Sequence, residues 1–211
     1  FFKARAYARR HYGRFAAATF ITASDGRDIA RYLSTNLTAV TPNAVIPADL
    51  LPPADIVRRP GEILFLGHYP HFPNEDAGLR LARNIFPLVK AGLPEASLNL
   101  AGSCPTPKIS ALAGPDILVP GTAADIRPFL WRAQVFAAPV RYGLGTKGKI
   151  LEAFAAGLPV IASREAAAGV EGAKDGVHLL TASSDRDFAA ATGLLLKDPV
   201  RRARLAAAAL E

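Results

Sequence analysis

A single carboxylate interrupts an otherwise apolar predicted helix, directly after a glycine-rich loop. The helix covers residues 147–157, and the neighbours of Glu152 there are isoleucine, leucine, alanine and phenylalanine. Burying a carboxylate without a partner is costly, so Glu152 should either turn to water or find a partner. A ligand hydroxyl would be such a partner. An ion pair with Lys149, three residues earlier on the helix, is the alternative.

The loop before this helix has the spacing of a dinucleotide fingerprint. Its glycines are Gly143, Gly145 and Gly148, in the pattern G-x-G-x-x-G, and Glu165 follows near the end of the next predicted strand, where a ribose-binding acid is expected. Residues 141–142 separate the preceding strand from the first glycine, which departs from the fingerprint. Despite this departure, the glycine spacing and Glu165 leave a dinucleotide-binding oxidoreductase domain as one hypothesis.

Residues 143–149 also read as a phosphate loop, G-x-x-x-x-G-K. The next residue is Ile150, where a serine or threonine should bind Mg²⁺, and this disfavours a nucleoside triphosphatase. Both patterns let backbone N–H groups and a helix N-terminus approach a phosphate. We therefore expect an anionic phosphate here, with a loop that only turns the chain as the structural alternative.

The elements that must position these residues alternate along the chain. Before residue 61 the sequence predicts an opening helix, a strand at 18–24, a helix at 25–34, and a short strand that begins at residue 37 and runs into a proline-rich link to residue 53. After it, short apolar strands are predicted at 62–67, 96–102, 116–121, 134–140, 158–163 and 177–182. Helices are predicted at 74–92, 106–114, 123–133, 147–157, 185–197 and 198–210. This pattern predicts an α/β fold with a doubly wound parallel sheet, which binds ligands beyond the carboxyl ends of its strands.

Composition narrows the class of protein. The chain has 211 residues, is 50% hydrophobic and carries a formal net charge of +7, which favours anionic partners. The single cysteine, Cys104, excludes an internal disulfide framework. The chain lacks methionine and begins within a predicted helix, so we expect a piece of a longer protein.

The first residues are basic, with no acid among them: Lys3, Arg5, Arg9, Arg10 and Arg14. They form either a solvated helix face or a patch for anionic lipid headgroups. Basic and aromatic residues do not interleave as in base-stacking proteins, so no nucleic-acid partner is expected.

The stretch 138–163, APVRYGLGTKGKILEAFAAGLPVIAS, resembles the signature region of the retaining GT-B glycosyltransferases of family 4, the group 1 glycosyltransferases. Residues 21–53, 63–105, 119–140 and 175–199 resemble further parts of that family in the same order. The resemblance implies that residues 1–55 end the N-terminal acceptor lobe and supply the linker. Residues 56–211 would be the C-terminal, Rossmann-like lobe that binds a nucleotide sugar.

The resemblance also implies roles for the loop and helix. Glu152 matches the second glutamate of an E-x7-E pair and would accept hydrogen bonds from the ribose hydroxyls of the donor. Leu144 stands where the first glutamate belongs, so the contacts of the donor sugar are open. The remaining implied donor-binding residues of this loop are Gly143, Gly145, Thr146, Lys147 and Lys149. Gly145 and Thr146 would act through backbone amides, and the two lysines through charge.

After its first strand the family often places an arginine and a lysine, which this chain lacks. Gly67 and His68 end that strand here, and His68 is the candidate donor to a phosphate. A metal site on His68 and His71 is disfavoured because other ligands are distant in sequence. Asn74 and Asp76 are expected to cap the next helix. Gly121 resembles the turn whose backbone faces the nucleobase.

Together these features predict a metal-independent glycosyltransferase that uses a nucleoside diphosphate sugar, needs no other cofactor and retains anomeric configuration. Cations, backbone amides and a helix N-terminus would stabilise the departing diphosphate. The expected acceptor is a saccharide or a lipid-linked sugar, with a cytoplasmic location and optional peripheral contact with an anionic membrane. No catalytic residue is nominated, and the 211 residues alone are expected to bind donor without transfer. A degenerate lobe that only binds nucleotides or partners is the non-enzyme alternative, motivated by Leu144.

Overall fold

The chain forms two compact units, Phe1–Ala44 and Val45–Glu211, in the computed structural model. The structure describes residues 2–142 and 147–211, apart from the side chains of residues 2–5, 24, 25, 28 and 147. The division falls within the proline-rich link that the sequence predicts.

The first unit is a small α/β element. It begins with α1 (Phe2–His11) and a short 3-10 helix, Tyr12–Arg14. Strands β1 (Ala18–Phe20) and β2 (Thr38–Val40) pair in parallel, and α2 (Ala23–Ala30) connects them. Strand β1 is shorter and α2 begins earlier than predicted, because pairing with β2 extends over only three residues.

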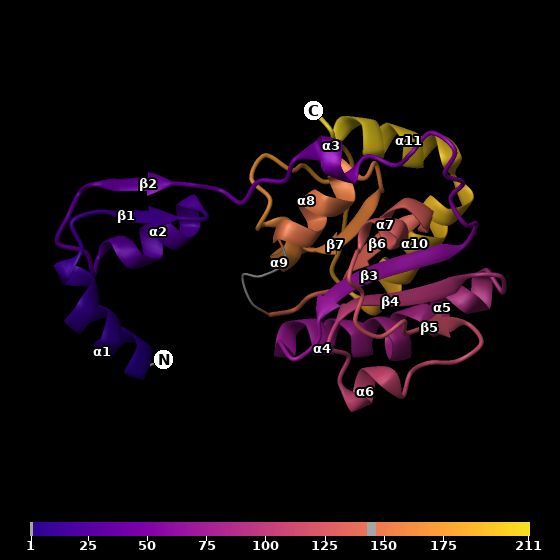
Figure 1. Cartoon of the computed structure of the whole chain (residues 1–211), viewed down its shortest axis with the longest axis horizontal. Coiled ribbons are helices and arrows are strands. Elements are labelled where there is room, and N and C mark those ends of the chain that lie inside the picture. The colour runs from indigo at the N-terminus through magenta and orange to yellow at the C-terminus, as the bar shows by residue number, and fades with distance from the viewer. Residues whose placement is uncertain (1, 143–146) are drawn as a thin grey trace. The chain divides into compact units, whose positions relative to one another are not determined.

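The second unit is built on a parallel sheet, drawn in Figure 1. Its strands are β3 (Glu62–His68), β4 (Ser97–Ser103), β5 (Ile117–Leu118), β6 (Val135–Ala138), β7 (Val160–Ser163) and β8 (Leu180–Ala182). Their order within the described residues is β5-β4-β3-β6-β7-β8, so the chain winds outward from β3 in both directions. This confirms the predicted doubly wound sheet and places its topological switch between β3 and β6.

The strands are apolar on both faces because helices cover the sheet. Residues 62–67 of β3 and all residues of β6 and β7 are buried. The helices of this unit are α3 (Pro47–Leu50), α4 (Phe72–Arg80), α5 (Phe86–Gly92), α6 (Pro107–Ser110), α7 (Arg127–Arg132), α8 (Lys147–Ala155), α9 (Arg164–Ala167), α10 (Asp185–Lys197) and α11 (Pro199–Ala208). The helix α8, which carries Glu152, lies near α3 and β7.

The single helix predicted over residues 74–92 is interrupted. Between α4 and α5 the backbone forms a π-helical segment, Leu81–Ile85. Pro87 has no N–H group to donate to the carbonyl four residues earlier, so the regular ladder of hydrogen bonds cannot pass through it. The wider π turn accommodates this break while Leu81 and Ile85 remain buried.

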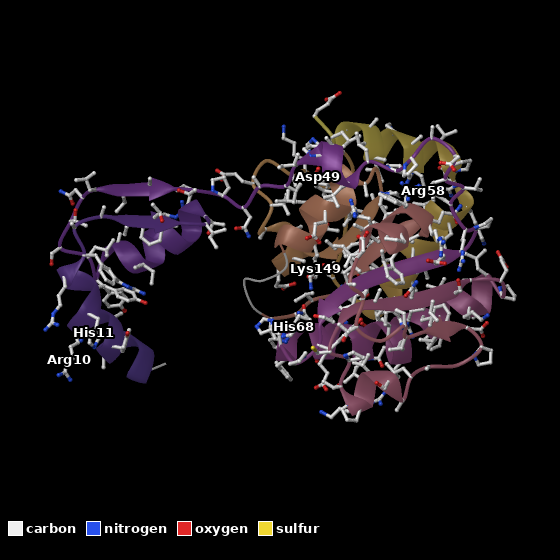
Figure 2. The ribbon with its side chains drawn as sticks, in the orientation of Figure 1. Arg10, His11, Asp49, Arg58, His68 and Lys149 are labelled. Carbon is white, nitrogen blue, oxygen red and sulfur yellow. The ribbon has the colours of Figure 1, made fainter. Side chains whose placement is uncertain are left out.

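Arg58, in the link before β3, ties two helix ends together (Figure 2). Its Nη1 donates to carbonyls in and just after the last turn of α7. Its Nη2 donates to carbonyls just after α8. The acceptors are Leu130, Trp131, Ala133, Ala156 and Gly157, at 2.8–3.4 Å. Carbonyls at helix ends lack partners within the helix, so one guanidinium satisfies a set of them. The base of the helix that carries Glu152 is thereby fixed.

Candidate functional site

An open cleft of about 430 Å³ lies beyond the carboxyl ends of β3 and β4. It is lined by Leu66, Gly67, His68, Asn74, Gly102, Ser103, Ala123, Ile126, Gly148, Lys149 and Glu152. Figure 2 shows the side chains of His68 and Lys149 at this edge of the sheet. Its position at the switch point is where doubly wound sheets bind ligands.

The floor of the cleft is formed by a close approach of two strands. Gly67 pairs with Gly102 in the register of β3 and β4. Gly102 has a φ of +130°, and a Cβ built on it would lie 2.0 Å from the carbonyl oxygen of Gly67. Only glycine fits there, so the strand ends are joined without side chains in between.

His68 is held by the strand next to it. Its Nδ1 lies 2.9 Å from the hydroxyl oxygen of Ser103, its register partner on β4. The imidazole is exposed and lines the cleft with Lys149. Its position suits the predicted hydrogen bond to a phosphate.

Lys149 enters the cleft from the first turn of α8. Its ammonium donates to Oδ1 of Asn74 at 2.5 Å and lies 4.9 Å from the centre of the Phe65 ring. Burial lowers the pKa of Lys149 to about 8, and the neighbouring Glu152 carboxylate opposes this shift. A half-buried cation is thus fixed at the N-terminal end of a helix, where phosphates bind.

Asn74 does not cap α4 as the sequence predicts. The N-cap is His71, whose side chain makes no capping bond, and Asn74 is buried inside the first turn. Its Nδ2 donates to the carbonyl of His68 at 2.9 Å. Asp76 also lies within the helix and accepts hydrogen bonds from Arg141 at 2.6 and 3.1 Å. Both side chains are used in tertiary contacts, which local sequence patterns do not reveal.

Glu152 lies one turn deeper on α8 and faces the same cleft. Within the described part of the chain its carboxylate accepts no hydrogen bond and has no cation within 4 Å. The alternative ion pair with Lys149 is absent at contact distance: that ammonium bonds to Asn74, and its charge acts on Glu152 only at longer range. Burial raises the pKa of Glu152, and the charge of Lys149 opposes the rise. The carboxylate is left with capacity for two ligand hydroxyl groups.

The family profile described as Glycosyl transferases group 1 matches residues 60–198, which is more than half of the chain. The chain belongs to this family. Among the curated proteins, none matches the sequence.

Solved structures share the fold of this group 1 glycosyltransferase domain. TarM superposes with a TM-score of 0.78 at 14% identity, covering 99% of this chain and 42% of TarM. HepE of Anabaena, solved with UDP and glucose, gives 0.74 at 15%, covering 98% and 61%. The C-terminal domain of a group 1 family protein, LpcC of Francisella tularensis, gives 0.57 at 17%, covering 79% and 95%. The chain thus spans less than two thirds of TarM and of HepE, and at these identities the likeness shows the fold alone.

The other predicted site residues of this glycosyltransferase domain divide into two groups. Gly143, Gly145 and Thr146 lie outside the described residues, and of Lys147 only the backbone, which begins α8, is described. Gly121 has a φ of +86° in the loop after β5. From that loop the described lining of the cleft contains Ala123 and Ile126 and not Gly121.

Asn74, Gly102 and Ser103 are among the cleft residues that the sequence did not predict as site residues. The last two end β4, so the rule that ligands bind beyond carboxyl ends of strands was the signal that pointed to them. Asn74 had no such signal. Among the described residues no group of three or more His, Cys, Asp or Glu side chains is arranged to hold a metal.

The fingerprint acid of the oxidoreductase hypothesis lies elsewhere. Glu165 is in the first turn of α9 after β7, and the cleft lining within the described residues does not contain it. Its carboxylate is exposed and near a helix N-terminus, a position that stabilises a negative charge without any ligand.

Proposed function

We propose that residues 56–211 form the donor-binding lobe of a glycosyltransferase that uses a nucleoside diphosphate sugar. Residues 1–55 would be the end of the acceptor lobe and the linker. The observation that carries this proposal is the half-buried carboxylate of Glu152, which accepts no hydrogen bond from any described residue and lies one turn from the fixed cation of Lys149. HepE, solved with UDP and glucose on the same fold, supports the choice of ligand class.

The ribose and diphosphate of the donor would take separate parts of the cleft. Glu152 would accept hydrogen bonds from the ribose hydroxyls. Lys149, His68 and the N–H groups at the start of α8 would contact the diphosphate. When the bond between the anomeric carbon and the diphosphate oxygen breaks, the electron pair leaves with the diphosphate. These positive groups stabilise that charge without reorganisation, which lowers the barrier.

The acceptor side of the reaction lies with the other lobe. The acceptor hydroxyl would form the new bond to the anomeric carbon with retention of configuration, and we nominate no group to receive its proton. A saccharide or lipid-linked acceptor is proposed from the exposed basic residues Arg9 and Arg10 on α1, which suit an anionic membrane surface. Among the described residues, no helix combines the length and apolarity needed to span a membrane. A vesicle flotation assay tests the membrane contact. We expect the chain to float with phosphatidylglycerol vesicles and not with neutral ones, and equal behaviour with both would contradict the contact.

A thermal-shift panel tests the proposed function. The 211-residue chain is melted with UDP, GDP, ADP, their common sugars and NAD(P), beside Glu152→Gln and Glu165→Gln. A ligand at 100 times its Kd adds about 2.7 kcal/mol of stability. We expect one nucleoside diphosphate to stabilise the wild type and Glu165→Gln by a similar amount, and Glu152→Gln much less. A shift with NAD(P) alone, lost in Glu165→Gln, would establish the oxidoreductase reading instead. No shift with any compound would favour a degenerate lobe that binds partners and not nucleotides.

A further inference from the structure

The segment after β3 carries no arginine or lysine toward the cleft, although a departing diphosphate needs positive charge. It carries Asn74, a neutral residue that is only 8% exposed. A buried amide in a ligand cleft must have its polar atoms satisfied. Both are: Nδ2 donates to the carbonyl of His68, and Oδ1 accepts from the ammonium of Lys149.

Asn74 thereby links the two elements that meet at the switch point. One end of its amide holds the carboxyl end of β3, next to the His68 imidazole, and the other end holds a side chain of α8. Lysine has a long, flexible side chain, so an ammonium without such an anchor samples many positions. The anchor and the ring of Phe65 fix it from two sides.

We propose that Asn74 is a positioning residue of the donor site, which holds the Lys149 ammonium where the diphosphate of the donor binds. Lys149 on α8 supplies the positive charge, and Asn74, in the segment after β3, holds it in place without adding a charge of its own. This inference rests on the proposed function, because it assumes that a nucleoside diphosphate occupies the cleft. It adds a residue that acts through Lys149 and needs no contact with substrate of its own.

A double-mutant cycle tests whether Asn74 acts through Lys149. UDP, or GDP or ADP where the wild type binds one of these more tightly, is titrated by calorimetry into wild type, Asn74→Ala, Lys149→Gln and the double variant. We expect Asn74→Ala to weaken binding about tenfold and to add almost nothing in the Lys149→Gln background. Asn84→Ala is the matched control, since Asn84 lies further along the same helical stretch and donates to Asp185. It should leave the Kd unchanged.

The pH profile of binding separates positioning from a merely structural role. The charged and titratable groups that line the cleft with Lys149 are Glu152 on its own helix and His68 at the end of β3. Wild-type affinity should fall as pH rises through about 8, where the ammonium loses its proton. Asn74→Ala should move this fall to lower pH because it removes an acceptor that favours the ammonium. Asn74→Asp should move this fall to higher pH. If Asn74→Ala does not fold, the pH profile of Asn74→Asp alone provides the test.

The outcomes separate this inference from the proposed function. Full additivity of Asn74→Ala and Lys149→Gln, or an unchanged pH profile in both Asn74 variants, overturns the positioning role. Binding that is lost in Glu152→Gln but unaffected by Lys149→Gln leaves the proposed function intact and removes the inference. A wild type that binds no nucleoside diphosphate refutes both.

Discussion

Gly67 and Gly102 meet at the carboxyl ends of β3 and β4 so closely that a Cβ on Gly102 would lie 2.0 Å from the Gly67 carbonyl oxygen. Each lines the cleft with its backbone alone. Real Cβ atoms do not approach a backbone oxygen this closely, so the pair sets both the register at the strand ends and the depth of the cleft. The site and the sheet depend here on the same two residues.

Gly102→Ala should therefore both destabilise the second unit and impair the cleft. The added methyl group clashes with backbone, and a φ of +130° is unfavourable for alanine. We expect a loss of about 2–4 kcal/mol in the free energy of unfolding, measured by urea denaturation. Gly92→Ala is the control, because Gly92 ends α5 with no atom within 4 Å of its added Cβ. Equal stability of the two variants would show that the strand ends are not so close.

Glu152→Gln should make the ligand-free chain more stable while it weakens nucleotide binding. Burial raises the pKa of Glu152 in the folded state, so between the unfolded and the folded pKa the folded chain binds more protons. Stability thus falls as pH rises through this interval, and at neutral pH the ionised carboxylate costs free energy. Removing its charge should therefore raise the Tm of the ligand-free chain.

The matched control for that charge is Glu165→Gln. Glu165 lies in the first turn of α9, where a negative charge is favourable, so its removal should lower Tm slightly and leave binding intact. A carboxylate that serves only structure would give the opposite result, with Glu152→Gln less stable than the wild type.

Two adjacent arginines, Arg58 and Arg59, test whether Arg58 holds the ends of α7 and α8 together. Arg58 makes five hydrogen bonds to carbonyls at the ends of α7 and α8. The Arg59 side chain is 57% exposed and lies 3.6 Å from Glu62. We expect Arg58→Ala to cost about 2–4 kcal/mol in thermal or urea unfolding because it leaves several carbonyls unsatisfied. Arg59→Ala should cost less, because it removes a single contact, at 3.6 Å from the buried Glu62 carboxylate, and similar losses in both variants would contradict this role of Arg58.

Lys149 should give a pH dependence of opposite sign to that of Glu152. Its pKa is lowered to about 8 in the folded state, from 10.5. Between these values the unfolded chain binds the proton and the folded chain does not, so this group makes stability rise with pH over that interval. The difference in unfolding free energy between wild type and Lys149→Met, measured at pH 7 and pH 10, should change by about 1–2 kcal/mol in favour of the wild type at high pH. No change would mean that the ammonium is well solvated.

The outline of the fold was predictable because its signals are local. Apolar strands and intervening helices alternate from residue 61 onward, and this pattern alone indicates a sheet covered on both faces. The break before Pro87 carried a local signal too, since proline interrupts a helix ladder. The short helices α3 and α9 were not predicted, although Pro47 in the first turn of α3 and the Ser163 N-cap of α9 are local signals for a helix start.

The site was predictable in part for the same reason. Glu152 and Lys149 follow a glycine loop on one helix, and His68 ends a strand, so sequence position identified them. The hydrogen bond from Lys149 to Asn74 joins residues 75 apart in the chain, and Arg58 donates to carbonyls up to 99 residues away. Such contacts depend on how β3, α7 and α8 pack, which no local pattern encodes.

Calorimetry with UDP and 2′,3′-dideoxy-UDP, on wild type and Glu152→Gln, tests most directly whether Glu152 binds the ribose. The matching GDP or ADP pair is used if the thermal-shift panel selects that base. Glu152 is proposed to accept hydrogen bonds from the two ribose hydroxyls. We predict that the wild type binds the dideoxy compound about 10–100-fold more weakly, and that Glu152→Gln no longer discriminates between the two. Equal discrimination by wild type and Glu152→Gln would contradict the account.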